Sequence, residues 1–273
     1  MSRVLLIDAD ILAYKATSAN QKKYDWGDGV VSTSADFTTA KRTARDTINA
    51  LMDDLKADEM IVCLSDDVNN FRKEIYPAYK TNRKGTERPQ YLYDLKEWLA
   101  DKYPTRITAN LEADDVMGIL ATEPSVDERI MVSEDKDMMT VPGLLFRPNQ
   151  PQLGVFRVSP LEATRFLFWQ TIVGDQTDGY PGAKGVGKAS PFALDVLEAE
   201  DEIEAWDEVL MAYQSAGLTE KDAVQQCNLA RILKHGDMAG NRVIPWVPPY
   251  DPERGNYCPL SEEEAVSGLF SSL

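Results

Sequence analysis

Short apolar runs alternate with amphipathic segments in the first half of the chain. The runs are RVLLID (3–8), MIVCLS (60–65) and RIMVS (129–133), and LLFRP (144–148) is a further candidate. Continuous apolar runs that contain valine and isoleucine are typical of strands buried on both faces of a sheet. We therefore predict buried strands at these places.

Apolar side chains recur at helical spacing between these runs. Segments 40–57 and 91–100 each place them on one stripe, and 112–121 does so after an acidic start. Strands that alternate with helices are typical of a mostly parallel sheet. We predict an α/β fold, with a mostly parallel central sheet flanked by helices, over residues 1–155.

The pattern becomes helical in the remaining part, residues 156–273. Helices are predicted at 161–173, 202–214 and 219–233. Segment 244–260 is rich in proline and polar residues and is expected to wrap the surface, while 261–270 is a candidate for a short acidic helix. The second part is therefore predicted to be a helical lobe with an irregular tail.

Composition narrows the class of protein. With 273 residues, 43% hydrophobic and 27% charged, the chain can bury a sizeable core. No run is apolar enough for a membrane span, and the start resembles a strand rather than a signal peptide. Cys63, Cys227 and Cys258 are widely spaced and odd in number, which favours a reducing compartment. We expect a cytoplasmic protein without membrane contact, in the host cytoplasm if a phage encodes it.

Two further features exclude common chemistries. His235 is the only histidine, so zinc sites built on histidines and a histidine-driven triad are excluded. The net charge of −16 repels phosphate at long range and, taken alone, argues against a general nucleic-acid binder. Any function that involves DNA therefore needs a locally different surface.

Acidic residues follow the predicted strands and open one predicted helix. The carboxyl ends of neighbouring parallel strands meet at one edge of a sheet, where ligands bind, so these side chains are expected to converge. Hard divalent ions with oxygen ligands, Mg²⁺ or Mn²⁺, would balance their charge. The acids are Asp8, Asp66, Asp67, Glu112, Asp114, Asp115, Glu134, Asp135, Asp137, Asp175 and Asp178.

Each acidic motif also has an ordinary explanation. EADD (112–115) is typical of helix capping, an Asp after a strand is commonly an N-cap, and GDQTDGYPG (174–182) resembles a turn. Their coincidence at one end of one sheet favours a metal site over solvation. Closely spaced divalent ions point to phosphoryl transfer, in which one ion activates water and another stabilises the leaving oxygen.

Two segments could hold a polyanion. Segment 71–88 has six Lys or Arg against two Glu, with Tyr76 and Tyr79 as faces for base stacking, although a solvated charged surface is the ordinary alternative. GAKGVGKAS (182–190) nearly fits a P-loop, but Ala189 replaces the required hydroxyl and no strand precedes it. It remains a candidate phosphate-gripping hairpin between two helices, or a plain glycine turn.

Together these motifs resemble the metal-dependent 5′ nuclease, or flap-endonuclease, family. LLIDAD, YKTNRK, LEADDVMG, SEDKDM and GDQTDGYPGAKGVGKA occur in that family's order, over residues 4 to about 198. The stretches NNFRKEIYPAYKTNRK, GDQTDGY and LARIL are similar to the 5′→3′ exonucleases of T7-like phages. The resemblance implies a PIN-like 5′ nuclease core with a helical arch at about 71–98, and a helix-hairpin-helix in the helical lobe.

The resemblance also implies roles for individual residues. Lys80 and Arg83 would touch the scissile phosphate, and Tyr79 and Lys84 would contact DNA. Lys184, Gly185, Gly187 and Lys188 would hold the duplex backbone in the helix-hairpin-helix. The implied metal ligands, direct or through water, are Asp8, Asp66, Glu112, Asp114, Asp115, Asp135, Asp137, Asp175 and Asp178.

The implied reaction is Mg²⁺- or Mn²⁺-dependent 5′→3′ hydrolysis of duplex DNA, and of RNA primers paired to DNA, with flap endonuclease activity as an addition. Two or more divalent ions are expected, with K⁺ as a candidate at the helix-hairpin-helix. The implied setting is phage replication, recombination and primer removal, with phage replication proteins as candidate partners of the acidic C-terminal segment. The chain departs from the family pattern near Asp66, where a shorter loop leaves Asp66 and Asp67 as alternative ligands, and at Glu134.

Two other functions stay open on the sequence. LIDADIL would also suit a phosphatase that forms an aspartyl-phosphate, with Asp8 as nucleophile and Asp10 as acid, although it leaves the basic segment unused. A non-catalytic scaffold that binds DNA ends would not need so many acids.

Overall fold

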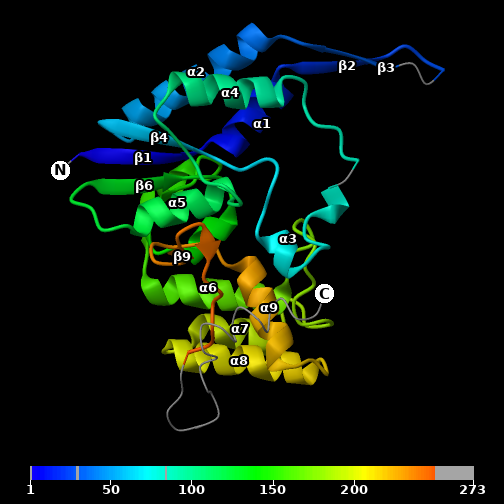
Figure 1. Cartoon of the computed structure of the whole chain (residues 1–273), viewed down its shortest axis with the longest axis vertical. Coiled ribbons are helices and arrows are strands. Elements are labelled where there is room, and N and C mark those ends of the chain that lie inside the picture. The colour runs from blue at the N-terminus through cyan, green and yellow to red at the C-terminus, as the bar shows by residue number, and fades with distance from the viewer. Residues whose placement is uncertain (1, 29–30, 84, 250–273) are drawn as a thin grey trace. The chain divides into compact units, whose positions relative to one another are not determined.

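The computed structural model describes residues 2–28, 31–83 and 85–249 (Figure 1). The chain forms two compact units. The first unit comprises Met1–Asn69, Gly85–Met138 and Gly143–Arg157, and the second comprises Asn70–Lys84, Met139–Pro142 and Val158–Leu273. The long C-terminal part of the second unit starts at Val158, close to the expected boundary at 155. The second unit also includes 70–84 and 139–142, which we had assigned to the α/β domain. Within the described ranges, no helix is long and apolar enough to cross a membrane.

A six-stranded sheet forms the centre of the first unit, in the order β5-β4-β1-β6-β7-β8. The pairs β1–β4, β1–β6, β4–β5 and β6–β7 are parallel, which confirms the predicted mostly parallel sheet. The four predicted strands are present within one or two residues. The strands are β1 (Arg3–Asp8), β4 (Glu59–Leu64), β5 (Thr105–Ile107), β6 (Glu128–Val132), β7 (Gly143–Phe146) and β8 (Val155–Val158).

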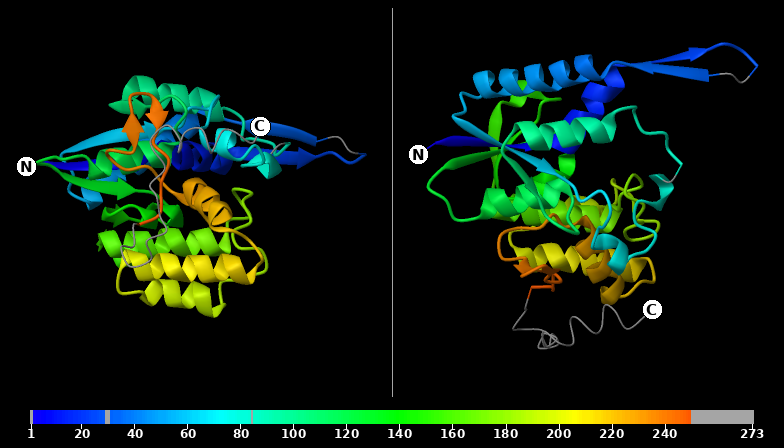
Figure 2. Two further views of the ribbon diagram at one scale, coloured as in Figure 1. Left: turned by 60° about the horizontal axis from the view of Figure 1, so that its bottom comes forward. Right: turned by 45° about the horizontal axis from the view of Figure 1, so that its top comes forward.

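Helices cover both faces of this sheet because its central strand is apolar on both sides. Leu5 and Ile7 of β1 join the core that α1, α2 and α4 cover, while Leu6 between them is equally buried on the opposite side. Helix α5 contacts β1, β4 and β6 on that opposite side (Figures 1 and 2). The helices are α1 (Ala9–Ala19), α2 (Phe37–Asp54), α4 (Leu92–Lys102) and α5 (Ala113–Thr122).

A second, two-stranded antiparallel ribbon in the first unit was not predicted. Its strands are β2 (Gln21–Asp25) and β3 (Val31–Ala35), and it extends away from the sheet and helices of that unit (Figure 2). The ribbon lacks the alternation of apolar and polar residues that marks a half-buried strand, so periodicity could not reveal it.

The predicted helical arch at 71–98 is helical only in parts. Helix α3 (Arg72–Ile75) is one turn long, η1 (Thr81–Arg83) is a 3₁₀ turn, and α4 begins only at Leu92. Pro77, Gly85 and Pro89 interrupt the segment, and helix interiors tolerate neither residue well. The described residues of this segment therefore form short helical turns and the start of α4 rather than one uninterrupted helix.

Helices α6 to α9 pack around an aromatic core in the second unit. The helices are α6 (Pro160–Val173), α7 (Pro191–Glu198), α8 (Glu202–Ser215) and α9 (Glu220–Ala230), and β9 (Met238–Ala239) pairs with β10 (Arg242–Val243). The predicted cap of α9 is present, since Thr219 and Asp222 form a capping box. Trp246 packs against Phe168 and Trp206, so residues near 246 contribute to the core rather than only covering it. The rest of the tail, with Cys258 and the expected helix at 261–270, lies outside the described residues.

A close backbone contact fixes the loop between α6 and α7. A Cβ atom on Gly182 would lie 2.4 Å from the backbone nitrogen of Gly174, and the φ of Gly182 is +63°. The Gly182 N–H donates to the side chain of Gln226 at 3.1 Å, and the Ala183 N–H donates to the carbonyl of Ile172 at 2.8 Å. Only glycine fits here, so the fold itself explains part of this glycine-rich motif.

We expect Gly182→Ala to lower the free energy of unfolding by roughly 3 kcal/mol, because the methyl group meets backbone atoms in a left-handed conformation. Urea denaturation measures the change. Gly217→Ala is the matched control, since Gly217 has a φ of +71° but open space at its Cβ position. It should cost only about 1 kcal/mol, and equal losses in the two variants would contradict the close-contact explanation.

Candidate active site

Asp8 lies at the carboxyl end of β1 and also caps the next helix. Its carboxylate accepts the Ile11 N–H at 3.0 Å and the Ser133 hydroxyl at 2.7 Å. The side chain is buried, and desolvation, together with the charges of Asp10 and Asp135, raises the pKa of Asp8 to about 7 despite these hydrogen bonds. A buried carboxyl group among other acids gains most from a nearby cation.

The start of α5 is bonded to the end of β4, which places the acidic helix terminus beside the strand ends. The Asp66 N–H donates to the carbonyl of Leu111 at 2.9 Å, and the Ala113 N–H donates to the Ser65 hydroxyl at 2.9 Å. In return the Asp66 carboxylate accepts the N–H groups of Asn110 and Val68, which lowers the pKa of Asp66 to about 2. Asp66 is therefore firmly ionised.

The acidic cluster at the start of α5 serves as a helix cap. Glu112 and Asp115 form a reciprocal capping box, with the Glu112 N–H donating to Asp115 at 3.1 Å. Asp115 is fully buried, whereas Asp114 is partly exposed in the first turn. Burial raises the pKa of the Cys63 thiol well above its usual value, and the charges of Asp8 and Asp114 raise it further, so both carboxylates lie within electrostatic reach of Cys63. The acids at the start of α5 can therefore cap this helix and also belong to an acidic cluster with Asp8.

The three acids that follow β6 differ in their partners. The Asp137 N–H donates to Asp135 at 2.9 Å, and Asp137 accepts Lys136 at 2.7 Å. Glu134 pairs instead with Lys15 of α1. The extra acid at position 134, where the chain departs from the family pattern, is thus neutralised by Lys15.

Lys96, which the sequence did not single out, pairs with two acids near the strand ends. Its ammonium group lies 2.6 Å from Asp67 and 2.9 Å from Asp10, and its side chain is only 9% exposed. Asp66 and Asp67 therefore have different partners in this structure, backbone N–H groups for the first and Lys96 for the second. The available signal was a lysine on the apolar stripe of α4, next to Leu95 and one turn before Leu99.

Seven of the nine predicted metal ligands thus lie in the first unit, at the carboxyl ends of its strands or on the segments that follow them. They are Asp8, Asp66, Glu112, Asp114, Asp115, Asp135 and Asp137. Among residues 2–28, 31–83 and 85–249, no three acidic, Cys or His side chains form a ready-made metal-binding group. The chemistry of the site fits a hard divalent ion, since its donors are carboxylate oxygens and one of them, Asp8, is buried with a raised pKa.

Asp175 and Asp178 belong to the second unit, where they form a turn with the basic segment. Asp175 accepts the Thr177 N–H at 2.7 Å. Asp178 accepts the Tyr79 hydroxyl at 2.8 Å and pairs with Arg83 at 2.5 Å and Lys80 at 3.5 Å. The two cations expected to touch phosphate are therefore positioned by a carboxylate expected to bind metal.

The basic segment is anchored in the second unit by Arg72. This buried guanidinium group donates to the carbonyls of Leu229 at 3.0 Å and Arg231 at 2.6 Å, at the end of α9. Tyr79 is 2% exposed and part of the core, so the expectation that its ring stacks on a base is wrong for this structure. Lys84 lies outside the described residues.

The glycine-rich loop between α6 and α7 presents its predicted contact residues on the surface. Lys184, Gly185, Gly187 and Lys188 are all exposed, and the Lys188 ammonium lies 5.7 Å from the centre of the Trp169 ring. Ser190 caps α7 by accepting the Ala193 N–H at 3.2 Å. The loop joins two helices, as expected for a hairpin and not for a P-loop.

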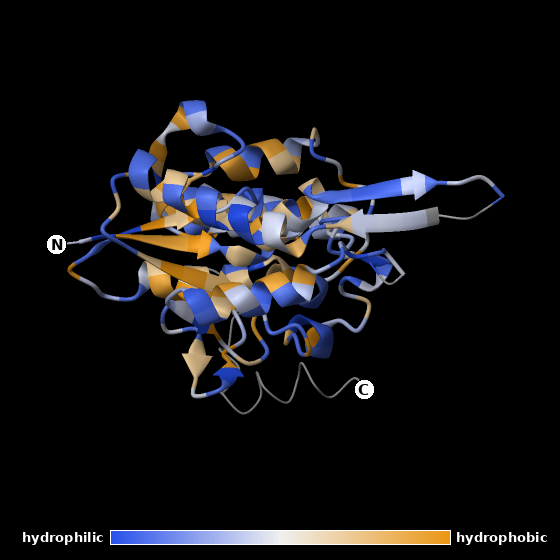
Figure 3. Cartoon of the chain, turned by 90° about the horizontal axis from the view of Figure 1, so that it is seen from above, coloured by the Kyte–Doolittle hydropathy of each residue, from blue (hydrophilic) through white to orange (hydrophobic). Residues whose placement is uncertain are grey.

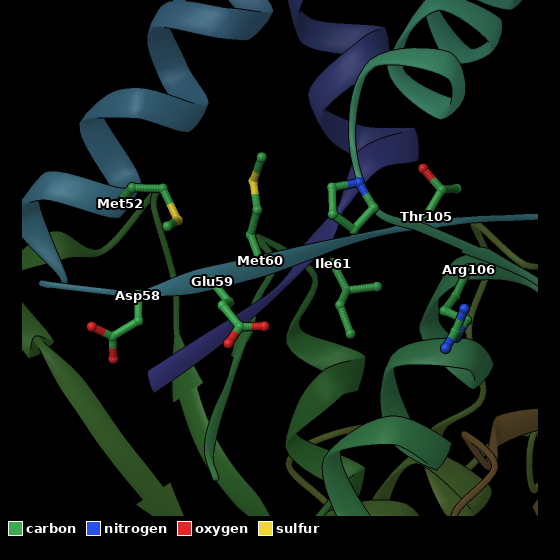
Figure 4. A pocket seen from close by; sticks show the side chains of 8 residues that line it. Met52, Asp58, Glu59, Met60, Ile61, Thr105 and Arg106 are labelled. Carbon is green, nitrogen blue, oxygen red and sulfur yellow. The ribbon is translucent and has the colours of Figure 1, made fainter. Parts of the chain in front are cut away.

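A separate pocket of about 450 Å³ lies elsewhere in the first unit (Figure 4). Its lining comes from α2, the start of β4 and the segment around β5, and it includes Met52, Met60 and Arg106. None of the predicted site residues lines it. The candidate active site therefore rests on the strand ends rather than on this pocket.

Known proteins are similar to this chain in sequence. Residues 3–143 match the N-terminal resolvase-like domain of 5′-3′ exonucleases. The exodeoxyribonuclease of Enterobacteria phage T3 is 30% identical, over 85% of this chain and 87% of that protein. The exonuclease of Escherichia phage T7 is 28% identical, over 86% and 89% of the two chains.

The fold also matches solved structures of the bacteriophage T5 enzyme. The T5 5′-exonuclease with bound zinc ions has a TM-score of 0.61 at 19% identity, covering 84% of this chain and 89% of that one. The T5 flap endonuclease in a pseudo-enzyme-product complex with DNA and metal ions has a TM-score of 0.60, also at 19% identity, with 84% and 88% covered. The predicted fold class is confirmed. The chain belongs to the 5′-3′ exonuclease and flap endonuclease family, and it is a hydrolase of the 5′-3′ exonuclease class.

Proposed function

We propose that this protein hydrolyses phosphodiester bonds of duplex DNA from the 5′ end, with divalent metal ions as cofactors. The observation that carries the proposal is the set of carboxylates around buried Asp8 at the carboxyl end of the parallel sheet. Such a set favours cations strongly, and phosphoryl transfer is the chemistry that uses oxygen-bound divalent ions without a nucleophilic side chain. The T5 relatives are crystallised with metal ions, which supports this assignment.

Asp8, Asp114 and Asp135 are the ligands we favour in the first unit. Asp135 raises the pKa of Asp8, and Asp8 and Asp114 both raise the pKa of the Cys63 thiol, which supports their lying in one acidic cluster. Asp66, Glu112 and Asp115 are also proposed as ligands, directly or through water, and the backbone hydrogen bonds described above would orient them. Bound Mg²⁺ or Mn²⁺, in two or more sites, would supply activated water and charge neutralisation. Asp137, Asp175 and Asp178 are further proposed ligands.

Lys80 and Arg83 are proposed to stabilise charge on the scissile phosphate. Both contact Asp178 in the second unit, and the Arg83 side chain is half-exposed. Lys and Arg form charge-assisted hydrogen bonds with carboxylates and with phosphates. A DNA phosphate can therefore replace the Asp178 carboxylate as the partner of Lys80 and Arg83. The ion pairs with Asp178 would therefore position Lys80 and Arg83 while leaving them able to bind a phosphate.

The exposed loop 184–188 is proposed to bind the duplex backbone, with K⁺ as a further candidate ligand of this helix-hairpin-helix. Contacts to phosphate carry no sequence information, so binding should be alike on all sequences and weaken with salt. RNA primers paired to DNA and 5′ flaps are proposed as additional substrates. We propose phage DNA replication, recombination and primer removal as the setting, with phage replication proteins as partners.

The two alternative functions fit less well. A phosphatase that uses Asp8 and Asp10 would need Asp10 as a proton donor, but Asp10 is paired with the ammonium group of Lys96. A DNA-end scaffold has no use for the buried acid at Asp8. Family membership also favours the exonuclease.

We expect the protein to release short nucleotides from a 5′-labelled duplex in Mg²⁺, and to be silenced by a chelator. Asp135→Asn should lower the cleavage rate by at least about 10²-fold, because it removes a metal-directed charge. A 3′-labelled duplex distinguishes the direction of attack.

Glu134→Gln is the matched control for this experiment, because Glu134 is adjacent but pairs with Lys15. It should retain cleavage, and circular dichroism should show both variants folded. Normal turnover by folded Asp135→Asn protein would refute the metal assignment.

We expect Lys80→Ala and Arg83→Ala to lower kcat by about 10²-fold while duplex affinity changes only a few-fold, since they act on charge that develops during cleavage. Single-turnover cleavage and equilibrium binding measure the two effects. Lys73→Ala, an exposed lysine of the same segment, is the control and should change neither. Equal losses of rate and affinity would assign Lys80 and Arg83 to docking instead.

We expect Lys188→Ala to weaken duplex binding equally on unrelated sequences and to flatten the slope of log affinity against log salt by about one unit. Binding titrations at several salt concentrations test this. Lys221→Ala on α9 removes an exposed charge of the same unit and should leave the slope unchanged. An unchanged slope for Lys188→Ala would exclude the loop from phosphate contact.

A further inference from the structure

The ribbon of β2 and β3 carries two aromatic rings on one exposed face. Lys22 and Tyr24 alternate along β2 and so share a face, opposite Ser34 and Ser32 of β3, and Trp26 follows two residues later, directly after the end of the strand. The indole N–H of Trp26 donates to the Ser32 hydroxyl at 2.8 Å, which confirms the shared side. We call this set, Lys22, Tyr24, Trp26, Ser32 and Ser34, the aromatic face.

The fold does not explain these rings. Trp26 is 70% exposed and Tyr24 is 45% exposed, and neither belongs to the hydrophobic cores of the two units. Their ring centres lie 6.2 Å apart with an angle of 28° between the planes, so they form a nearly parallel pair. An aromatic pair that stays exposed to water does not contribute the free energy that its burial in a core would give. Such a pair therefore indicates a binding site for a ligand that would cover it.

The root of the ribbon is fixed to the loop 85–91 of the same unit. The Gln90 N–H donates to the side chain of Gln21 at 2.7 Å, and Lys23 pairs with Glu87 at 2.5 Å on the side opposite the aromatic face. In sequence, this loop continues the basic segment that we assign to phosphate contact. The ribbon therefore contacts the residues that follow Lys80 and Arg83 in the sequence.

We propose that the aromatic face binds single-stranded nucleic acid, by base stacking on Tyr24 and Trp26 with Lys22 beside the backbone phosphates. The inference rests on the proposed function and extends it to a single-stranded 5′ extension of the substrate. Stacking on aromatic rings is independent of sequence, and interleaved cations are its usual companions.

The chemistry of the face favours nucleic acid over a protein partner. Its only charged side chain is Lys22, in a chain of net charge −16, so it is locally complementary to phosphate. The described ribbon residues 21–28 and 32–35 include no Leu, Ile, Met or Phe, and the ribbon is coloured hydrophilic to neutral in Figure 3. The face therefore offers two aromatic rings and one cation without aliphatic side chains beside them.

The test compares binding to a duplex with a 5′ single-stranded extension of about ten nucleotides and to the blunt duplex. Full-length protein carrying Asp135→Asn is used, so that Mg²⁺ can be present without turnover. Trp26→Ala and Tyr24→Ala should each lower affinity for the extended duplex about tenfold, as expected for losing one stacked base, and leave blunt-duplex affinity unchanged. Trp26→Phe retains a ring and should largely restore binding.

Tyr93→Ala is the matched control, because Tyr93 is 46% exposed in the same unit but lies on α4. It should bind both duplexes like the parent, and all variants should keep the parent melting temperature, since no core residue changes. Parent-like affinity of folded Trp26→Ala and Tyr24→Ala protein for the extended duplex would overturn the proposal, as would an equal loss on the blunt duplex. Cleavage of the 5′-labelled duplex by wild-type protein is a separate readout, so failure of the proposed function is distinguishable from failure of this site.

Discussion

Repulsion between carboxylates is the constraint on which the first unit depends. Strand ends and a helix terminus bring acids together around Asp8, whose pKa is raised to about 7 by burial and by its neighbours. The protein offsets part of this cost itself: Lys96 pairs with Asp10 and Asp67, and backbone N–H groups hold Asp66. Asp8 keeps a raised pKa despite its hydrogen bonds to Ile11 and Ser133, so a bound cation would stabilise its charged form.

The ordinary and the functional explanations of these acids turn out to be compatible. Asp8 caps α1 and Glu112 and Asp115 cap α5, as a purely structural interpretation would expect. The same caps stand at the carboxyl end of the sheet, where a parallel topology gathers ligand-binding groups. Caps that fold the helices therefore also set the positions of acidic groups, so a change at one of them affects stability and chemistry together.

Periodicity predicted the buried strands and the amphipathic helices well, because burial on two faces or one stripe leaves a strong pattern. It failed where polar backbone pairing dominates, as in the ribbon of β2 and β3, and where Pro77 and Gly85 interrupt the expected arch. The position of several acids at or after strand ends was predictable from the sequence, whereas the pairing of Lys96 was not, since its partners Asp10 and Asp67 come from distant parts of the sequence. Tyr79 was misplaced because sequence alone does not show which aromatic rings are buried.

Arg72 has a consequence for how the chain can be divided. Its guanidinium group is buried against carbonyls that lie 157 and 159 residues further along the chain. Any truncation that removes the end of α9 would strand this cation in an apolar interior, which costs far more than a lost surface contact. These hydrogen bonds therefore link the basic segment to the end of α9. We expect the basic segment to need the C-terminal helices in order to fold.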